Sequence, residues 1–257
     1  MKTAINIVWF EQDLRLGDNP AFTAAVEKGS ILPIFILDND NAGEYQLGAA
    51  SSWWLHHSLT ALNQALKGKL NFYTGDANAV ITDLCDRFLV GGIYWNRRYE
   101  PWRISRDKKI KKHLLEQGVH AQSFNGALLN EPWTILKKDD TPYKIFTPYH
   151  NQAIKIETDT SALPEPQLPE SINTDEQSVN LDALSLLPNI DWDTHFYDCW
   201  TPGESGAKSS LYRFLDDGLE DYKQGRDFPA LNAVSTLSPH LHFGEISPRQ
   251  INNILLS

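Results

Sequence analysis

Five short, mostly apolar runs, each separated from the next by a helical pattern, constrain the fold of the first 130 residues more than any other feature. They are rich in β-branched and aromatic side chains and lack a regular polar alternation, which is typical of strands buried on both faces of a parallel sheet. The predicted strands are Ile5–Phe10, Ile31–Leu37, Leu70–Tyr73, Gly92–Trp95 and Val119–Phe124.

The intervening segments repeat apolar residues every three or four positions, as one face of an amphipathic helix does. The three clearest sets are Leu55, Leu59, Leu62 and Leu66; Val80, Ile81, Leu84 and Phe88; and Ile110, Leu114 and Leu115. Four glycines stand where helix C-caps are expected before the next strand, namely Gly29, Gly68, Gly91 and Gly118. Alternation of this kind predicts a doubly wound parallel five-stranded α/β sheet, whose ligands bind beyond the carboxyl ends of its strands. Neither a GxGxxG nor a GxxxxGK[ST] motif is present.

The negative charge of the chain is concentrated in one segment. The net charge is -10, and residues 156–198 contain ten acidic residues and no Lys or Arg, so the remainder holds 23 acids and 23 bases. Four prolines interrupt the same segment. We therefore predict an inter-domain connection over residues 133–198 that is acidic and Pro-containing from 156. The neutral bodies on either side neither indicate nor exclude a basic DNA-binding face.

After the connection the pattern becomes helical. Leu211, Phe214, Leu215, Leu219 and Tyr222 form one predicted stripe. Ser238-Pro239 and Ser247-Pro248 each match a helix N-cap followed by Pro at the first helical position.

No apolar run is long enough to span a bilayer, and the apolar stretch at the N-terminus is too short for a signal peptide. The two cysteines, Cys85 and Cys199, have no spacing typical of a disulfide framework or a zinc site. We expect a cytoplasmic protein without a metal site.

Five segments resemble the DNA photolyase/cryptochrome family, and they follow one another in the family's order along nearly the whole chain. They are VWFEQDLRLGDNPAF at 8–22, GAASSWWLHHSLTALNQAL at 48–66, YWNRRYEPWRISRD at 94–107, DDTPYKIFTPYHNQ at 139–152, and residues 202–251, which begin PGESGAKSSLYRFLDDG. The nearest likeness is to bacterial cyclobutane pyrimidine dimer photolyases.

The resemblance implies a Rossmann-like antenna domain over residues 1–132, the connection, and the first part of an all-helical FAD-binding domain over 199–257. It implies light-driven repair of pyrimidine dimers in damaged DNA by electron transfer from reduced FAD, in a monomer. Family members can also carry an antenna pigment, either methenyltetrahydrofolate or a deazaflavin, and for this chain the absence of an antenna is an equally open alternative. Because the family's catalytic and electron-relay residues lie further along the family's chain, we expect this portion to be incomplete, inactive and without catalytic residues.

The resemblance also implies roles for particular residues. Tyr222 and the segment Val234, Ser235, Thr236, Leu237 and Ser238 would bind FAD, and Arg226 would bind the DNA backbone. A phenolic hydroxyl, serine and threonine hydroxyls and a guanidinium are suitable partners for phosphates. Val234 stands where the family usually has Thr, so one hydroxyl is missing here.

Other interpretations remain open at this stage. Tyr222 and Arg226 are ordinary as a core and a solvent residue, and Ser238 as a plain N-cap. Asp13, Arg15 and Asp18 suggest a structural loop network, and His240 and His242 suggest packing or surface positions. Asn96, Arg97, Arg98 and Glu100 follow a strand where an antenna pigment could approach, while Glu11 replaces an Arg common in the family. For the whole chain, a cryptochrome-type blue-light photoreceptor and a stand-alone chromophore- or nucleotide-binding α/β domain are the alternatives.

Overall fold

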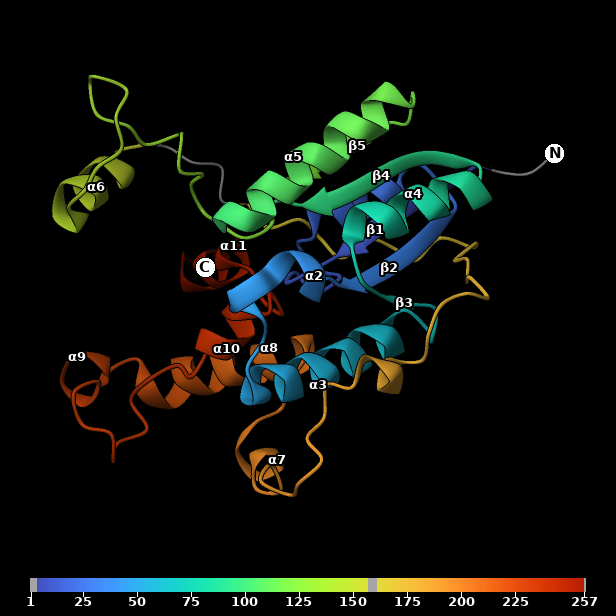
Figure 1. Cartoon of the computed structure of the whole chain (residues 1–257). Coiled ribbons are helices and arrows are strands. Elements are labelled where there is room, and N and C mark those ends of the chain that lie inside the picture. The colour runs from blue at the N-terminus through green and yellow to red at the C-terminus, as the bar shows by residue number, and fades with distance from the viewer. Residues whose placement is uncertain (1–3, 157–160, 257) are drawn as a thin grey trace.

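A twisted sheet of five parallel strands forms the centre of the molecule (Figure 1). The computed structural model describes residues 4–156 and 161–256. The strands are β1 (Ile5–Phe10), β2 (Ile31–Leu37), β3 (Asn71–Thr74), β4 (Val90–Asn96) and β5 (Ala121–Phe124), in the spatial order β3-β2-β1-β4-β5. The predicted five-stranded parallel α/β sheet is therefore confirmed, with strand ends shifted by one or two residues. The two halves of the sheet diverge from β1, which is where such sheets place their ligands.

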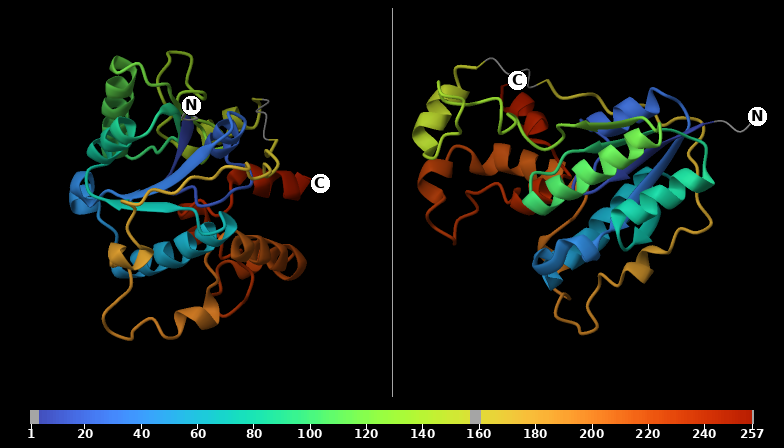
Figure 2. Two further views of the ribbon diagram at one scale, coloured as in Figure 1. Left: turned by 90° about the vertical axis from the view of Figure 1, so that its right-hand side faces the viewer. Right: turned by 45° about the horizontal axis from the view of Figure 1, so that its top comes forward.

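Helices cover both faces of the sheet (Figure 2). α1 (Pro20–Val26) and α3 (Ala49–Ala65) pack on one face, and α4 (Ala77–Arg87) and α5 (Pro101–Glu116) pack on the other. The short α2 (Asn39–Ala42) and η1 (Gly43–Tyr45) follow β2. The helical periods correctly located α3, α4 and α5, but Leu115 is 57% exposed and does not share the buried face of Ile110 and Leu114. Gly91 is not a helix cap, because it lies inside β4.

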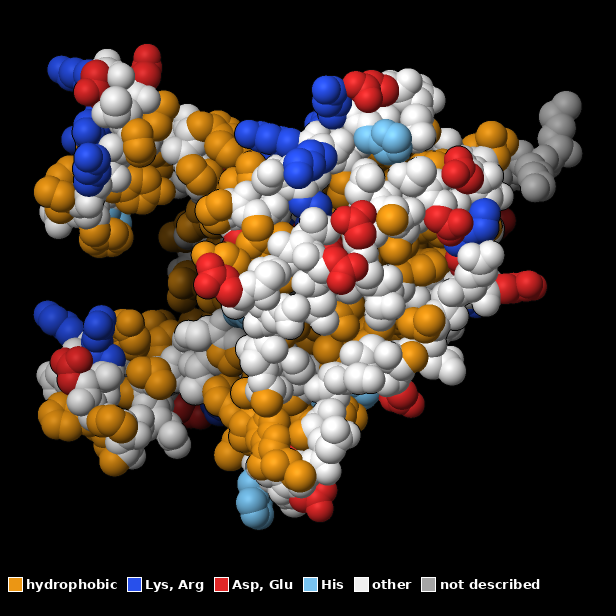
Figure 3. Space-filling model, viewed as in Figure 1, with side chains coloured by type: hydrophobic (Ala, Val, Ile, Leu, Met, Phe, Trp, Pro, Cys, Tyr) orange, Lys and Arg blue, Asp and Glu red, His pale blue; other side chains and the backbone are white. Residues whose placement is uncertain are grey.

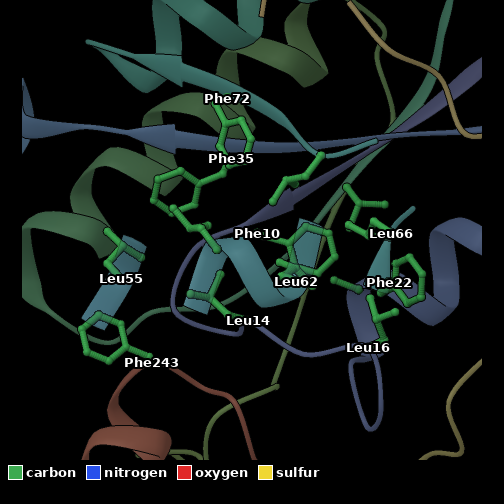
Figure 4. Packing of buried hydrophobic residues seen from close by; sticks show 14 of the residues in the cluster. Phe10, Leu14, Leu16, Phe22, Phe35, Leu55, Leu62, Leu66, Phe72 and Phe243 are labelled. Carbon is green, nitrogen blue, oxygen red and sulfur yellow. The ribbon is translucent and has the colours of Figure 1, made fainter. Parts of the chain in front are cut away.

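Each face of the sheet has its own apolar layer. On the α1 and α3 side, Phe10, Phe22, Phe35 and Leu62 pack together, and Phe243 from the C-terminal region joins the same cluster (Figure 4). The other layer is centred on Trp9 and lies under α4 and α5. These two layers contain far more buried apolar side chains than the small cluster of the C-terminal region, so hydrophobic stabilisation comes mainly from the α/β unit.

The connection is partly bound to the sheet. α6 (Phe146–Ala153) projects from the body of the molecule, and residues 157–160, which include part of the predicted acidic connection, lie outside the described residues (Figure 1). Further along, Ile172 bridges to Ile31 of β2 and Val179 bridges to Phe72 of β3. Arg87 and Tyr73 both bond to Asp175, whose carboxylate accepts from Arg87 Nη1 at 2.7 Å. η2 (Leu181–Leu184) then brings Leu184 into the apolar layer beside α3.

The C-terminal region is helical but more interrupted than its sequence pattern predicts. It contains α7 (Phe196–Cys199), α8 (Glu204–Arg213), η3 (Phe214–Gly218), α9 (Tyr222–Gly225), α10 (Ser238–His242) and α11 (Pro248–Leu256). η3 is a π-helical turn, which rotates the residues that follow it away from the α8 face. As a result the predicted stripe is wrong beyond Leu215: Leu219 and Tyr222 are exposed.

Buried polar side chains from the loop after β1 hold the C-terminal helices against the sheet. Arg15 is fully buried and donates to four carbonyl oxygens, those of Gly17, Asp18, Gly126 and Gly244, at 2.6–3.0 Å. The Asp18 carboxylate accepts from Ser247 and from Arg249 Nε. The structural network predicted for Asp13, Arg15 and Asp18 is therefore present, and it also bonds to α11 and to the loop before it.

Gly244 is required where these two parts meet. Its φ of 67° lies in the left-handed region, and a Cβ there would come within 2.2 Å of the Gln12 carbonyl oxygen. Only glycine permits this approach without moving one backbone or the other.

No helix in the two described ranges is both long enough and apolar enough to cross a membrane.

Replacing Arg15 with Met leaves four buried carbonyls without their shared donor. We expect the Arg15→Met variant to lose about 3–5 kcal/mol in the free energy of unfolding, measured by urea denaturation. Arg226→Met is the matched control, because Arg226 is exposed and its contacts are an ion pair with its neighbour Asp227 and a packing contact with the exposed Tyr222 ring. Equal stability of the two variants would contradict a structural role for Arg15.

Candidate functional site

Tyr222 and Arg226 lie together on the outer lobe of the helical region. Tyr222 is 40% exposed, and its ring packs edge-on against Phe214 of the π-helical turn. The Arg226 guanidinium lies over the Tyr222 ring, 5.6 Å from its centroid. The i, i+4 pairing expected from the sequence is present, and both polar ends remain accessible from solvent.

The segment from Val234 to Ser238 presents hydroxyl and amide groups. Val234 and Ser238 are exposed, Ser235 and Thr236 are half-buried, and Leu237 is buried in the small apolar cluster of the helical region. Arg213 Nη2 donates to Thr236 Oγ1 at 3.4 Å, so a guanidinium lies beside these hydroxyls. Within the described part of the chain, the amides of Thr236 and Ser238 have no hydrogen-bond acceptor.

Thr236 has a strained backbone. Its φ of 54° is in the left-handed region, which β-branched residues rarely occupy. Such strain is found at ligand-binding sites more often than elsewhere. A left-handed residue next to Leu237, which is in the right-handed helical region (φ -80°, ψ -8°), can direct successive N–H groups to one point, as anion-binding loops do.

The expected N-cap by Ser238 is wrong. Ser238 is the first residue of α10, Leu237 takes the cap position, and no side chain caps this helix. Capping at α11 is as expected: Ser247 Oγ accepts from Gln250 N at 2.9 Å while Gln250 Oε1 accepts from Ser247 N. The Ser238 hydroxyl is consequently available, and it borders an open groove lined by Trp54, Trp200 and Phe243.

His240 has a packing role. It is buried and bonds through Nδ1 to Glu245, which also accepts from Trp54 Nε1 at 2.9 Å and from the Gly203 amide at 2.7 Å. His242 instead shares a hydrogen bond with Gln12. These contacts join α10 to α3 and to the end of β1.

A second candidate site lies at the carboxyl ends of β1 and β2. This strand-end cavity encloses about 60 Å³ and widens to about 520 Å³ with its open mouth. Its wall combines charged and aromatic side chains, and Phe243 from the helical region closes one side. The charged and aromatic lining includes Glu11, Asp38, Tyr45, Trp102, Arg103 and Arg106.

Arg106 organises the charges of this cavity. It is buried, with its guanidinium over the Trp9 and Trp102 rings. It pairs with Glu11, with Asp38 at 3.3 Å and with Asp107 at 2.8 Å. Arg103 pairs with the other oxygen of Glu11 at 3.2 Å. Burial opposes ionisation of Glu11, but the two arginines hold the pKa of its carboxyl below the ordinary value.

The sequence suggested that an antenna pigment could approach Asn96, Arg97, Arg98 and Glu100, and none of these four residues lines the strand-end cavity. Asn96 is buried and donates to Asp13 Oδ2 at 2.6 Å, and Arg97 pairs with Glu131, so neither lines the cavity. Arg98 bonds to Gln12 and to Glu100. The residues that do line it, Asp38 and Arg106, were missed. The sequence did contain a signal for Asp38, because this residue directly follows β2 at the edge of the sheet where ligands bind.

Comparison with known proteins agrees with these geometric features. The profile of the DNA photolyase family matches residues 6–169. The chain belongs to the DNA photolyase family. A deoxyribodipyrimidine photo-lyase of Agrobacterium fabrum is 42% identical over 98% of the chain. Cryptochrome-2 of Arabidopsis thaliana is 34% identical over 95% of it.

Solved structures give the same result. A bacterial class III photolyase from Agrobacterium tumefaciens superimposes with a TM-score of 0.89 at 40% identity, covering 98% of this chain and 52% of the other. An archaeal photolyase from Sulfolobus tokodaii, described with two FAD molecules and a novel light-harvesting cofactor, has a TM-score of 0.76 at 25% identity over 98% of this chain and 55% of the other. The chain spans 53% of the Agrobacterium photo-lyase and 42% of the Arabidopsis cryptochrome, about half the length of its relatives.

Glycine at position 236 removes the backbone strain. We expect Thr236→Gly to raise the free energy of unfolding by about 1 kcal/mol or less, because relief of strain outweighs the extra entropy of the unfolded chain. Thermal denaturation measures the effect. The control Thr194→Gly replaces an exposed threonine without positive φ and is expected to be neutral or destabilising. A destabilised Thr236→Gly would mean that the left-handed residue is not strained.

Proposed function

We propose that this chain forms the antenna unit and the first part of the flavin-binding unit of a light-dependent DNA repair enzyme, a cyclobutane pyrimidine dimer photolyase. The observation that carries the proposal is the Val234–Ser238 segment, where hydroxyls, two unpaired amides and Arg213 converge in a chain of the photolyase family. Bound FAD would supply the photochemistry, an electron given to the lesion and returned.

The residues present fit a diphosphate. Hydroxyl and amide donors can bond to phosphate oxygens, and Arg213 compensates their charge. Ser235, Thr236 and Ser238 would hold the phosphates, with Val234 and Leu237 contributing backbone and packing. Tyr222, fixed between Phe214 and Arg226, would offer its phenolic O–H to the same group.

Arg226 is suited to a DNA phosphate. Its side chain is 56% exposed, and Lys223 lies three residues before it on α9. Figure 3 shows Lys and Arg side chains next to acidic ones on this lobe, which a notch separates from the lobe that carries α6. A few cations on a projecting lobe can position a DNA backbone although the whole chain is acidic, since contacts with phosphates act locally.

The strand-end cavity is the proposed antenna site. Its enclosed part admits only the edge of a planar ring system, and its wider mouth has room for the remainder. Trp102 offers a stacking surface. Glu11 Oε2 is buried and forms an ion pair with Arg103 at 3.2 Å without an aligned hydrogen bond, so it can still accept one from a ligand. Methenyltetrahydrofolate and a deazaflavin both remain candidate pigments. The cytoplasmic location, the monomeric state and the domain boundaries at residues 132 and 198 stay predictions.

Cryptochrome-type signalling is the second candidate, because a plant cryptochrome is among the relatives above 30% identity. Light-dependent repair of an oligonucleotide with a thymine dimer by the full reading frame distinguishes the two. Repair supports the photolyase, and its absence in a flavin-loaded, folded protein would overturn it in favour of signalling.

Removing the hydroxyls of the proposed phosphate site should weaken flavin binding. In the full reading frame, we expect Ser235→Ala with Thr236→Val to raise the dissociation constant for FAD about 100- to 200-fold, since each of the two lost bonds to a charged group costs about 1.5 kcal/mol. Flavin fluorescence titration of the apoprotein measures this. The pair Ser52→Ala with Thr60→Val on α3 is the control. Equal FAD affinities of the double variant and the wild type would show that the hydroxyls of Ser235 and Thr236 do not bind FAD.

Arg226 is expected to contribute one phosphate contact. Arg226→Met in the full reading frame should lower the salt dependence of DNA binding by about one unit of slope while leaving the preference for lesion over intact DNA nearly unchanged. Fluorescence anisotropy at several salt concentrations measures both quantities. An unaltered slope would place Arg226 outside the DNA interface.

A further inference from the structure

Three carboxylates from three elements surround Arg106 at the wall of the strand-end cavity. Glu11 comes from the end of β1, Asp38 from the end of β2, and Asp107 from α5 beside Arg106 itself. Arg103 adds one further cation, on Glu11. Two guanidinium groups thus face three carboxylates, and the cluster carries one uncompensated negative charge if all are ionised.

The three carboxylates are not held equally. Glu11 contacts both arginines, and Asp38 accepts additional bonds from the Asn41 amide and side chain at 2.9–3.1 Å. Among the residues that the structure describes, Asp107 bonds to Arg106, which it shares with the other two carboxylates, and to the indole N–H of Trp95, which donates to Oδ2 at 3.2 Å. Of the three carboxylates, Asp107 therefore loses the least ion-pair stabilisation when it binds a proton.

We propose that Asp107 is a positioning residue that takes up a proton and thereby sets the charge of the strand-end cavity, making its affinity for an anionic chromophore depend on pH. This rests on the antenna role proposed above for the cavity. Asp107 lies behind the cavity wall and touches no ligand. Asp107 acts through Arg106. When Asp107 is ionised it shares the Arg106 guanidinium with Glu11 and Asp38, and when Asp107 is protonated the guanidinium pairs with those two carboxylates alone.

Electrostatics agree with this geometry. Burial, followed by the charge of Glu11, raises the pKa of Asp107 to about 7. Below this pH the cluster is neutral, and above it one negative charge remains near the cavity. The other charged groups that face the cluster belong to elements around it; they are Asp76 before α4, Arg98 and Glu100 before α5, and His242 of α10.

The sign of the effect follows from charge alone. An anionic ligand is repelled by ionised Asp107, so its affinity falls as pH rises through 7. At pH 6 about nine-tenths of Asp107 is protonated, and at pH 7.5 about one quarter, given a pKa near 7.

Because the Trp95 indole N–H donates to Asp107, its NMR resonance should respond to protonation of the Asp107 carboxylate, and no ligand is needed for this measurement. In the 257-residue chain labelled with ¹⁵N-tryptophan, the Trp95 indole resonance, assigned through Trp95→Phe, should move with a midpoint near pH 7. Asp107→Asn should abolish this movement, whereas Asp86→Asn, on the exposed side of α4, should preserve it. Glu11→Gln should shift the midpoint to lower pH by removing a repelling charge, a result that a purely structural Asp107 would not give.

Folic acid tests the coupling to binding, because its two carboxylates stay ionised between pH 6 and 7.5. We expect about threefold weaker binding at pH 7.5 than at pH 6 in the wild type, and equal binding at both values in Asp107→Asn, measured by tryptophan fluorescence quenching.

The outcomes separate the two proposals. A Trp95 resonance that does not titrate, or that titrates equally in Asp107→Asn, overturns the proton site. Titration together with pH-independent folate binding overturns the coupling. If Trp95 titrates but folate binds at neither pH, the cavity is not a folate antenna site, and the coupling of Asp107 to the binding of an anionic folate is overturned while the proton site stands.

Discussion

The buried guanidinium of Arg15 is the interaction on which the arrangement of the molecule depends. It donates to carbonyls that belong to the loop after β1, to the segment after β5 and to the loop before α11. These three backbones are far apart in the sequence, and none could supply its own donor at that point. Together with the bonds from Ser247 to Asp18 and from Trp54 to Glu245, this side chain fixes the position of the helical region relative to the sheet, and with it the position of Phe243 at the strand-end cavity.

The same interface joins the two candidate sites. His240 and His242 of α10 contact α3 and the end of β1, and α10 begins at Ser238 of the proposed phosphate site. The hydroxyl segment therefore leads into the first residue of this short helix, and Phe243, which lines the strand-end cavity, directly follows its last. For an enzyme that passes excitation energy from an antenna to a flavin, a rigid element between the two chromophores would keep their separation and orientation constant.

The sequence predicted the α/β unit almost completely, because periodicity reports burial, and burial determines strands such as β2 and helices such as α3. It failed where local geometry depends on distant contacts. The π-helical turn at Phe214–Gly218 breaks a stripe that looks continuous, and Leu237 displaces Ser238 from the cap position. The grouping of Glu11, Asp38 and Arg106 could not be predicted, since these residues lie on three elements and meet only when the sheet forms. The roles of Tyr222, Arg226 and the Val234–Ser238 segment came from family resemblance, and they stay predictions.

The connection has a consequence for the order of assembly. Its residues Ile172 and Val179 bridge to β2 and β3, and Leu184 adds to the apolar layer beside α3, which Phe243 joins later in the chain. Synthesis from the N-terminus would therefore deliver all five strands well before the last part of their own hydrophobic layer. Until residues 184 and 243 have both emerged from the ribosome, the α3 side of the new sheet stays partly uncovered, which makes this interval the one in which a chaperone has most to bind.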